Sequence, residues 1–277
     1  MGNTHATPKC LRLMTYNVEW GFLKLPSDIK KDSCGHPIPD TDKAQEQHLT
    51  LVAKNIGLMS PDICFLQEMG SIEAVEFVRD KLKDIFGVTY KAYYSSDDTG
   101  YQAVGLLVAS SENYTVESIP DFPLKRAIAV IIGGVCIVGV HLKSLYDHDY
   151  TKDTKEQIEQ LECVQKWLNG RDAVICGDFN NVPSSKTITT MKDYGFTDML
   201  STDKYVPNIT RDTFTEFYGS EAEGSQIDYV FASKNLLQGH VSSHIVNIQR
   251  ETAKNRQSSE YRSENSDHLP LVSIFKI

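Results

Sequence analysis

Six short apolar runs, each bounded by an acid, an amide or a histidine, constrain what this chain can fold into more than any other feature. The runs cover residues 11–17, 63–68, 135–141, 174–180 and 227–231, and the stretch entered from residues 267–268. Runs of this length and composition are typical of buried strands. Because strands are rigid supports, polar groups at their ends can converge on one cavity from distant positions. The pattern predicts a site that holds a metal ion or transfers a proton.

The length and composition are those of an ordinary globular protein. The chain has 277 residues, of which 40% are hydrophobic and 23% are charged. Neither an internal repeat nor a low-complexity linker divides it, so we predict one domain over residues 1–277, with residues 1–10 as a flexible segment. No apolar run approaches the roughly 20 residues that span a bilayer, and nothing at the N-terminus suggests secretion.

Charge and cysteine usage restrict the function classes. The net charge of −9 argues against a tight, non-specific nucleic-acid-binding module, which usually carries a basic surface. It argues less against an enzyme, because metal ions at an acidic site can offset repulsion from a phosphodiester. Cys64, Cys136 and Cys176 lie inside apolar runs and behave as small core residues. We expect reduced cysteines and an intracellular protein, cytoplasmic or nuclear.

The spacing of apolar residues predicts an α/β protein. Helices are expected over residues 41–58, 71–86, 154–168 and 184–194, with Ser71 as an N-cap and Gly87 just after a helix end. Further strands are expected near residues 89–94, 102–109, 114–119, 127–132, 173–177, 212–217, 240–248 and 271–277. Two long loops are expected, over residues 18–40 and 251–266. Two mixed sheets packed face to face, with helices outside, would satisfy this pattern.

The strongest single motif is Gly177-Asp178-Phe179-Asn180, which follows an apolar run directly. Glycine would let the chain turn sharply and leave room for a ligand. Asp178 and Asn180 would then project to one side, where a carboxylate could accept a proton from water and an amide could donate to a phosphate oxygen. The alternative is a simple turn, since Gly, Asp and Asn are all turn formers.

The second motif is the pair Asp267-His268, which precedes the last apolar run. Histidine can act as an acid or a base near neutral pH, but it needs an orienting carboxylate. Asp228 lies in a strand-like run, where an unpaired carboxylate would be costly, so pairing with His268 would explain it. The alternative is a capping aspartate beside a surface histidine.

Three further residues end buried runs. Glu68 offers the hard oxygen ligands that suit Mg²⁺ or Mn²⁺. His141 could donate to a phosphate, and Lys143, two residues later, could add positive charge. Asn17 ends the first run in the same manner. Taken singly, each of these residues has an ordinary structural explanation; taken together they indicate one site.

These motifs, in this order, resemble the endonuclease/exonuclease/phosphatase superfamily, which includes DNase I, exonuclease III and the inositol 5-phosphatases. The strings that carry the resemblance are TYNVEW, FLQE, VHLKS, ICGDFNNVP, QIDYVF and SDHLPL. The resemblance implies a four-layer α/β sandwich. It implies Glu68 as the principal Mg²⁺ ligand with Asn17 and Asp267 close to the metal, Asp178 as the group that orients or deprotonates water, Asn180 and His141 as phosphate-binding groups, and His268 paired with Asp228.

The details within the family favour a nuclease. HLKS at residues 141–144 disfavours abasic-site repair, and QIDY at 226–229 differs from the inositol 5-phosphatase pattern, whereas GDFNNVPSS is closest to nucleases, including poly(A)-removing deadenylases. We therefore expect a monomeric, Mg²⁺-dependent nuclease (Mn²⁺ also fits) that acts on DNA rather than RNA. The alternatives are an RNA 3′ exonuclease and a phosphomonoesterase or phospholipase of the same fold. A binding protein without activity is disfavoured by the complete polar set.

Overall fold

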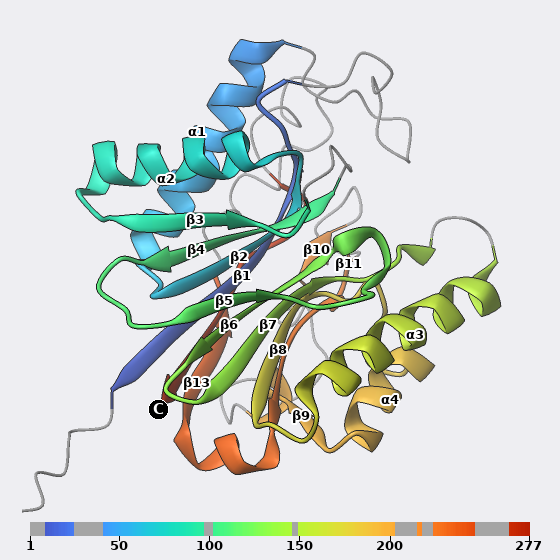
Figure 1. Cartoon of the computed structure of the whole chain (residues 1–277). Coiled ribbons are helices and arrows are strands. Elements are labelled where there is room, and N and C mark those ends of the chain that lie inside the picture. The colour runs from blue at the N-terminus through green and yellow to red at the C-terminus, as the bar shows by residue number, and fades with distance from the viewer. Residues whose placement is uncertain are drawn as a thin grey trace, which may run out of the picture.

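The computed structural model describes residues 9–24, 41–96, 102–145, 149–202, 215–217, 224–246 and 266–277. Two six-stranded mixed sheets pack face to face, and helices lie on both outer sides (Figure 1). This is the four-layer α/β sandwich that the sequence predicts. Most of the two predicted long loops, residues 25–40 and 251–265, and the first part of the strand predicted over 212–217 lie outside the described residues.

The first sheet is built from strands of both ends of the chain. Its strands are β1 (Cys10–Gly21), β2 (Ile63–Met69), β3 (Tyr90–Tyr94), β4 (Ala103–Ala109), β13 (His240–Ile245) and β14 (Leu271–Lys276). They lie in the order β13-β14-β1-β2-β4-β3, and only β1 and β2 run parallel among these neighbours. Lys9 and Cys10 belong to the segment that was expected to be flexible. The backbone of Lys9 hydrogen-bonds that of Ile277, and Cys10 pairs with Lys276 of β14.

The second sheet comes from the middle of the chain. Its strands are β5 (Thr115–Ser118), β6 (Ala127–Ile132), β7 (Val135–His141), β8 (Ala173–Asp178), β9 (Phe196–Asp198) and β12 (Asp228–Ser233). They lie in the order β5-β6-β7-β8-β12-β9, with β7 and β8 parallel. A separate two-stranded ribbon pairs β10 (Glu216–Phe217) with β11 (Gly224–Ser225).

Helices cover the outer face of each sheet. They are α1 (Asp42–Met59) and α2 (Ile72–Phe86) on the first sheet, and α3 (Tyr150–Leu168) and α4 (Lys186–Asp193) on the second (Figure 1). Three shorter elements are α5 (Met199–Thr202) and the 3₁₀ turns η1 (Pro123–Lys125) and η4 (Lys234–Gly239). Met199 and Leu200 of α5 belong to the core between the sheets. As predicted, Ser71 accepts a hydrogen bond from the Ala74 amide and Gly87 ends α2 at φ +70°. None of the helices among the described residues is long and apolar enough to cross a membrane.

Two element boundaries differ by four residues from those predicted, one in β1 and one in α3. The first strand continues past Asn17 to Gly21, although its pairing with β2 is irregular between these two residues. Helix α3 begins at Tyr150, one turn earlier than predicted, because the Asp149 side chain caps it by accepting from the Lys152 amide. Apolar spacing alone did not indicate either extension, since both are made of polar or mixed residues.

The core explains why the strand-like runs are continuously apolar. In β2, Ile63 and Phe65 face the second sheet, whereas Cys64 and Leu66 face the helices. Side chains of a strand alternate between its two faces, so a strand covered on both sides is apolar at every position. The five cysteines that the structure describes are free; Cys34 lies outside the described residues.

Candidate active site

Strand register brings the predicted residues of the second sheet into one row. His141 at the end of β7 is the partner of Asp178 at the end of β8, and Asp178 is in turn the partner of Asp228 at the start of β12. Partners on neighbouring strands are directly adjacent and their side chains leave the sheet on the same side. In the first sheet, Asn17 of β1 is the partner of Gln67, the residue before Glu68.

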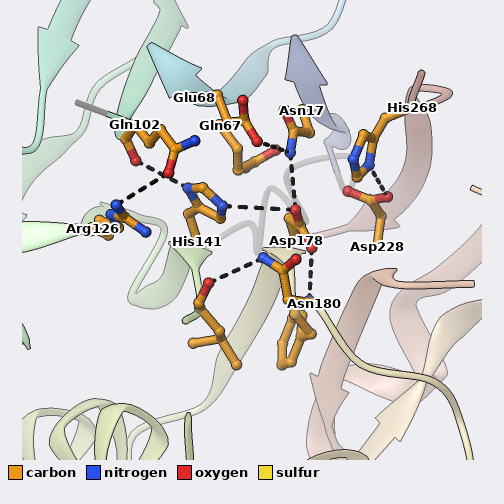
Figure 2. Close-up of polar contacts among 12 residues, drawn as sticks. Asn17, Gln67, Glu68, Gln102, Arg126, His141, Asp178, Asn180, Asp228 and His268 are labelled. Carbon is orange, nitrogen blue, oxygen red and sulfur yellow. Dashed lines mark hydrogen bonds and ion pairs between the residues drawn. The ribbon is translucent and has the colours of Figure 1, made fainter. Parts of the chain in front are cut away.

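The Asn17 side chain joins the two sheets at the centre of the site. Its Nδ2 donates to Glu68 Oε1 at 3.2 Å and to Asp178 Oδ2 at 2.9 Å (Figure 2). The two carboxylates therefore lie within two hydrogen-bond lengths of each other, a span that one hydrated cation can bridge. Asn17 and Asp178 are both buried, at 1% exposure each.

An irregular backbone orients Glu68. Its own φ is +62°, and Glu19 and Trp20 opposite it have φ of +50° and +59°. This geometry lets the Trp20 amide donate to Glu68 Oε2 at 3.1 Å. Residues of this kind rarely adopt positive φ, and such strain is concentrated at functional sites. Trp20 lies in the segment that the sequence analysis assigned to a loop.

The loop after β8 has both features that its sequence suggested. Asp178 Oδ1 accepts from the Asn180 amide at 2.7 Å, and Asn180 has φ +50°, so the segment is a side-chain-stabilised turn. The other oxygen, Oδ2, is directed into the site toward Asn17. Asn180 Nδ2 donates to the Leu142 carbonyl at 3.1 Å, which ties this loop to the end of β7.

Gly177 serves a different purpose from the one expected. It lies within β8 at φ +140°, and a Cβ atom built on it would lie 1.9 Å from the Val140 carbonyl oxygen of β7. The glycine is therefore required by the close approach of the neighbouring strand, and the space it leaves is filled by that strand rather than by a ligand.

His268 and Asp228 form the buried ion pair that the sequence analysis expected. His268 Nδ1 lies 2.8 Å from Asp228 Oδ2 (Figure 2). The opposite ring nitrogen, Nε2, lies 3.8 Å from Asp267 Oδ1. Burial lowers the pKa of His268, but the charge and hydrogen bond of Asp228, followed by the charges of Asp267 and Asp178, raise it well above the ordinary value. These partners therefore favour the charged form of the ring.

The surroundings of His141 favour its neutral form, in contrast to those of His268. Its Nδ1 lies 3.0 Å from the Gln102 carbonyl, an acceptor, so Nδ1 carries the proton and a neutral ring has an unprotonated Nε2. That Nε2 lies 3.8 Å from Asp178 Oδ2. Burial and then the charge of Arg126 lower the pKa of His141 to about 3. A neutral ring in this tautomer cannot donate from Nε2.

The sequence analysis missed Gln102 and Arg126, two residues that contact the site. Arg126 Nη2 donates to the Gln102 side-chain carbonyl at 3.2 Å (Figure 2). Burial lowers the pKa of Arg126, while the charges of Glu68 and Asp178 raise it, so the guanidinium interacts electrostatically with both carboxylates. Each residue directly precedes an apolar run, at residues 103–109 and 127–132, so the same boundary signal could have found them.

Two predicted residues lie toward the edges of the site. Asp267 donates its amide to Glu19 Oε2 at 3.0 Å, and its carboxylate charge raises the pKa of Glu68, whose main cause of elevation is burial. Lys143, expected to bind substrate, has its Nζ 4.0 Å from Asp153 Oδ1 of α3. Its ammonium group is thus held near α3 as well as near the end of β7.

The acidic cluster fits a hard divalent cation. Burial, together with the charge of Asp228, raises the pKa of Asp178 well above its ordinary value, and Asp228 Oδ1 is buried with no hydrogen-bond partner among the described residues. Ligand atoms of Asp178, Asp228 and His268 lie within 4.8 Å of one another. Because His268 Nδ1 is engaged by Asp228, the carboxylates of Glu68 and Asp267 are the groups whose chemistry best suits such a cation.

A family model described as "Endonuclease/Exonuclease/phosphatase family" matches residues 14–268. A comparison with curated protein sequences finds no match.

Solved structures of similar fold include three enzymes. The 3′ phosphatase NExo from Neisseria, bound to product DNA hairpin, has a TM-score of 0.65 and 17% identity, over 96% of this chain and 100% of that one. An AP endonuclease from Archaeoglobus fulgidus has a TM-score of 0.65 and 18% identity, over 96% and 100%. A humanized D. rerio TDP2 has a TM-score of 0.63 and 17% identity, over 97% and 99%. At these identities the similarity shows the fold alone.

Proposed function

We propose that this chain, which belongs to the endonuclease/exonuclease/phosphatase family, is a Mg²⁺-dependent phosphodiesterase that cuts DNA by in-line attack of water. The single observation that carries the proposal is the Asn17 amide, which hydrogen-bonds Glu68 of the first sheet and Asp178 of the second. It makes one site from acids that lie 110 positions apart in the sequence, since 178 − 68 = 110.

Glu68 would be the principal ligand of the cation, with Asn17 and Asp267 close to it. Hard carboxylate oxygens suit Mg²⁺, and Mn²⁺ also fits such a set. Asn17 turns Nδ2 toward Glu68 and Oδ1 toward the Glu19 amide, so in this arrangement it would orient Glu68 beside the ion. When bound, the ion would polarise a phosphoryl oxygen and stabilise the charge of the transition state. It would also offset the repulsion between a phosphodiester and a chain of net charge −9.

Asp178 would accept the proton of the attacking water. Its Oδ2 faces the site, and its raised pKa brings the carboxylate closer to the range in which a base works well. Its Oδ1 is occupied by the Asn180 amide, so one oxygen orients the group while the other takes part in the reaction. Asn180 Nδ2 donates to the Leu142 carbonyl, which fixes the side chain, and its second amide hydrogen would donate to an oxygen of the scissile phosphate.

Positive charge at the site would come from His268 and Arg126, while His141 would become protonated when a phosphate binds. The His268 ring is charged before substrate binds, with Asp228 behind it, and Nε2 is directed away from that partner. Arg126 adds a second cation near Glu68 and Asp178. His141 can donate to a phosphate only after Nε2 takes a proton, and an anionic phosphate beside the ring favours that protonation.

The preference for DNA is supported by the solved structures of similar fold rather than by the site itself. The NExo structure is bound to a DNA hairpin, and the second enzyme is named as an AP endonuclease. The motif GDFNNVPSS also resembles deadenylases, so an RNA 3′ exonuclease is the second candidate. A phosphomonoesterase or phospholipase is the third, since the family name includes phosphatases.

The test is hydrolysis of plasmid DNA, single-stranded DNA, poly(A) RNA and inositol phosphates, each incubated separately with Mg²⁺. We expect turnover of DNA that chelation by EDTA abolishes and that Glu68→Gln lowers by several orders of magnitude. The matched control is Glu73→Gln, which changes an exposed acid in the first turn of α2. Full activity in EDTA, or in the Glu68 variant, would contradict the proposal.

A further inference from the structure

We infer that Gln157 of α3 is a positioning residue that sets the relative placement of the two loops carrying the active-site groups; this rests on the proposed function. The β7 loop (residues 142–144) follows His141. The β8 loop (residues 179–183) follows Asp178 and includes Asn180. Gln157 is 0% exposed and lies behind both loops, so it touches neither the water nor the phosphate.

The amide nitrogen of Gln157 donates to both loops. Its Nε2 lies 2.6 Å from the Lys143 carbonyl in the β7 loop and 3.2 Å from the Phe179 carbonyl in the β8 loop. Both partners can only accept, so the nitrogen is assigned to this side of the carboxamide. One rigid planar group thus fixes the separation of two backbone segments.

The amide oxygen of Gln157 also accepts two hydrogen bonds. Its Oε1 accepts from Asn181 Nδ2 at 3.0 Å and from Thr187 Oγ1 at 2.6 Å. Asn181 belongs to the β8 loop, and Thr187 lies in the first turn of α4, fully buried at 0% exposure. These two donors prevent the carboxamide from rotating, so its two N–H groups stay directed at the loops.

The position of Gln157 in α3 indicates that packing alone does not account for it. Leu161, Val164 and Leu168 follow it at helical spacing and form the buried apolar stripe of α3. Residue 157 continues that stripe, and an apolar side chain there would serve the core. A buried amide costs free energy unless its hydrogen bonds are complete, which here means binding both loops.

Direct bonds between the loops show how the constraint reaches the reacting groups. The Leu142 amide donates to the Asp178 carbonyl at 2.9 Å, and Asn180 Nδ2 donates to the Leu142 carbonyl. His141 Nε2 and Asp178 Oδ2 are separated by 3.8 Å across this junction. A displacement of about 1 Å in such a site can cost roughly 100-fold in rate.

The experiment compares Gln157→Leu and Thr187→Val with wild type. Gln157→Leu removes the donors with little change in volume, and Thr187→Val removes only one hydroxyl that orients the carboxamide. We expect kcat on DNA to fall roughly 10- to 100-fold for Gln157→Leu, with KM changed less than about threefold, and to fall less for Thr187→Val. Amide hydrogen exchange should become faster in the β7 loop and the β8 loop together.

Gln160→Leu is the matched control. Gln160 is also a buried glutamine of α3, but within the described part of the chain its side chain bonds to the β7 loop only, where Oε1 accepts from the Lys143 amide. We expect faster exchange in the β7 loop alone and a smaller loss of kcat. A folded Gln157→Leu protein with wild-type kcat, or with exchange changed in one loop only, would overturn the inference.

Two further outcomes are also decisive. If Gln157→Leu does not fold, Thr187→Val carries the test, and unchanged exchange and kcat in that variant would overturn the inference. If wild type hydrolyses none of the phosphate esters, the proposed function fails, whereas the exchange measurements still decide whether Gln157 holds the two loops together.

Discussion

His268 Nδ1 lies 2.8 Å from Asp228 Oδ2, and this pair joins the two sheets at the candidate active site. Asp228 begins β12 of the second sheet, and His268 precedes β14 of the first. Both side chains are buried, which would be costly for either charge alone. The pair therefore favours a charged imidazole whose position is fixed by the fold before any substrate binds.

The first prediction concerns that charge. Asp228→Asn keeps the shape of the side chain but removes the charge that raises the pKa of His268, so this pKa should fall. The charged ring would then be lost at a lower pH, and the alkaline limb of the kcat profile should move to lower pH. At neutral pH we expect a loss of about 10²- to 10⁴-fold in kcat, measured together with the NMR titration of the ring.

Asp172→Asn is the control for this variant. Asp172 precedes β8, at the end of that strand opposite to Asp178, and bonds to Ser233 and Asn235. The Asp172→Asn variant should leave both the pH profile of kcat and the NMR titration of His268 unchanged. A wild-type profile in the Asp228 variant would remove the ion pair from the mechanism.

The second prediction concerns the pH dependence of stability. The pKa of His141 is about 3 in the folded protein, against an ordinary 6.5, so the unfolded chain binds the proton more readily. The stabilising contribution is fully present above pH 6.5 and is lost as the pH falls from 6.5 toward 3. Relative to His141→Asn, the free energy of unfolding of wild type should fall by up to about 1.4 kcal/mol per pH unit in this window.

Urea unfolding at several pH values measures this difference directly. Other groups of the site also titrate, but their contributions are common to both proteins to first order, so the comparison isolates His141. If the free energies of unfolding of wild type and variant changed in parallel between about pH 6.5 and 4, the buried ring would not be held neutral.

The third prediction concerns Gly177. A Cβ atom there would meet the Val140 carbonyl at 1.9 Å, so Gly177→Ala must push β7 and β8 apart. We expect a loss of about 3 kcal/mol or more in the free energy of unfolding. Gly134→Ala is the control, because Gly134 also has a positive φ, +84°, but nothing within 4 Å of its Cβ position. Equal losses in the two variants would show that backbone strain, not the contact, sets the cost.

Much of this architecture could be predicted because the chain marks its strands unusually clearly. Strands covered on both faces are apolar throughout, so β2, β7 and β8 stand out, and the residues at their ends are polar for a reason other than exposure. The pairing of His268 with Asp228 followed from the cost of burying a carboxylate alone.

The remaining features depend on tertiary geometry that local sequence does not encode. The Trp20 amide reaches Glu68 through two residues at positive φ, which no pattern of residue types indicates. The tautomer of His141 depends on the main-chain carbonyl of Gln102, and every residue type has such a carbonyl. Arg126 could have been found from its position before an apolar run, but a single arginine there is ordinary.

The last prediction concerns Arg126 and its partner Gln102. The charges of Glu68 and Asp178 raise the pKa of the Arg126 guanidinium, and its Nη2 donates to the Gln102 side chain at 3.2 Å. If it binds the scissile phosphate, Arg126→Ala should lower kcat/KM by about 10²- to 10³-fold, the usual cost of removing one positioned donor. Arg126→Lys should recover part of this loss, since it restores the charge but not the planar pair of donors.

Gln102→Ala separates the two contacts of that residue. The main-chain carbonyl remains for His141 Nδ1, whereas the side-chain acceptor for Arg126 is lost. We expect a smaller fall in kcat/KM than for Arg126→Ala. The pH dependence of the free energy of unfolding that is attributed to His141 should stay unchanged.

Arg171→Ala is the control for the loss of an arginine. Arg171 stacks on Trp167, 4.2 Å from the ring centroid, and donates to the Trp167 and Leu168 carbonyls at the end of α3, so its removal should leave kcat/KM unchanged. Because both variants lose one positive charge, a difference between them isolates the position of the guanidinium from the net charge of the protein. Activity of Arg126→Ala within about twofold of wild type would place phosphate binding on His268 and the cation alone.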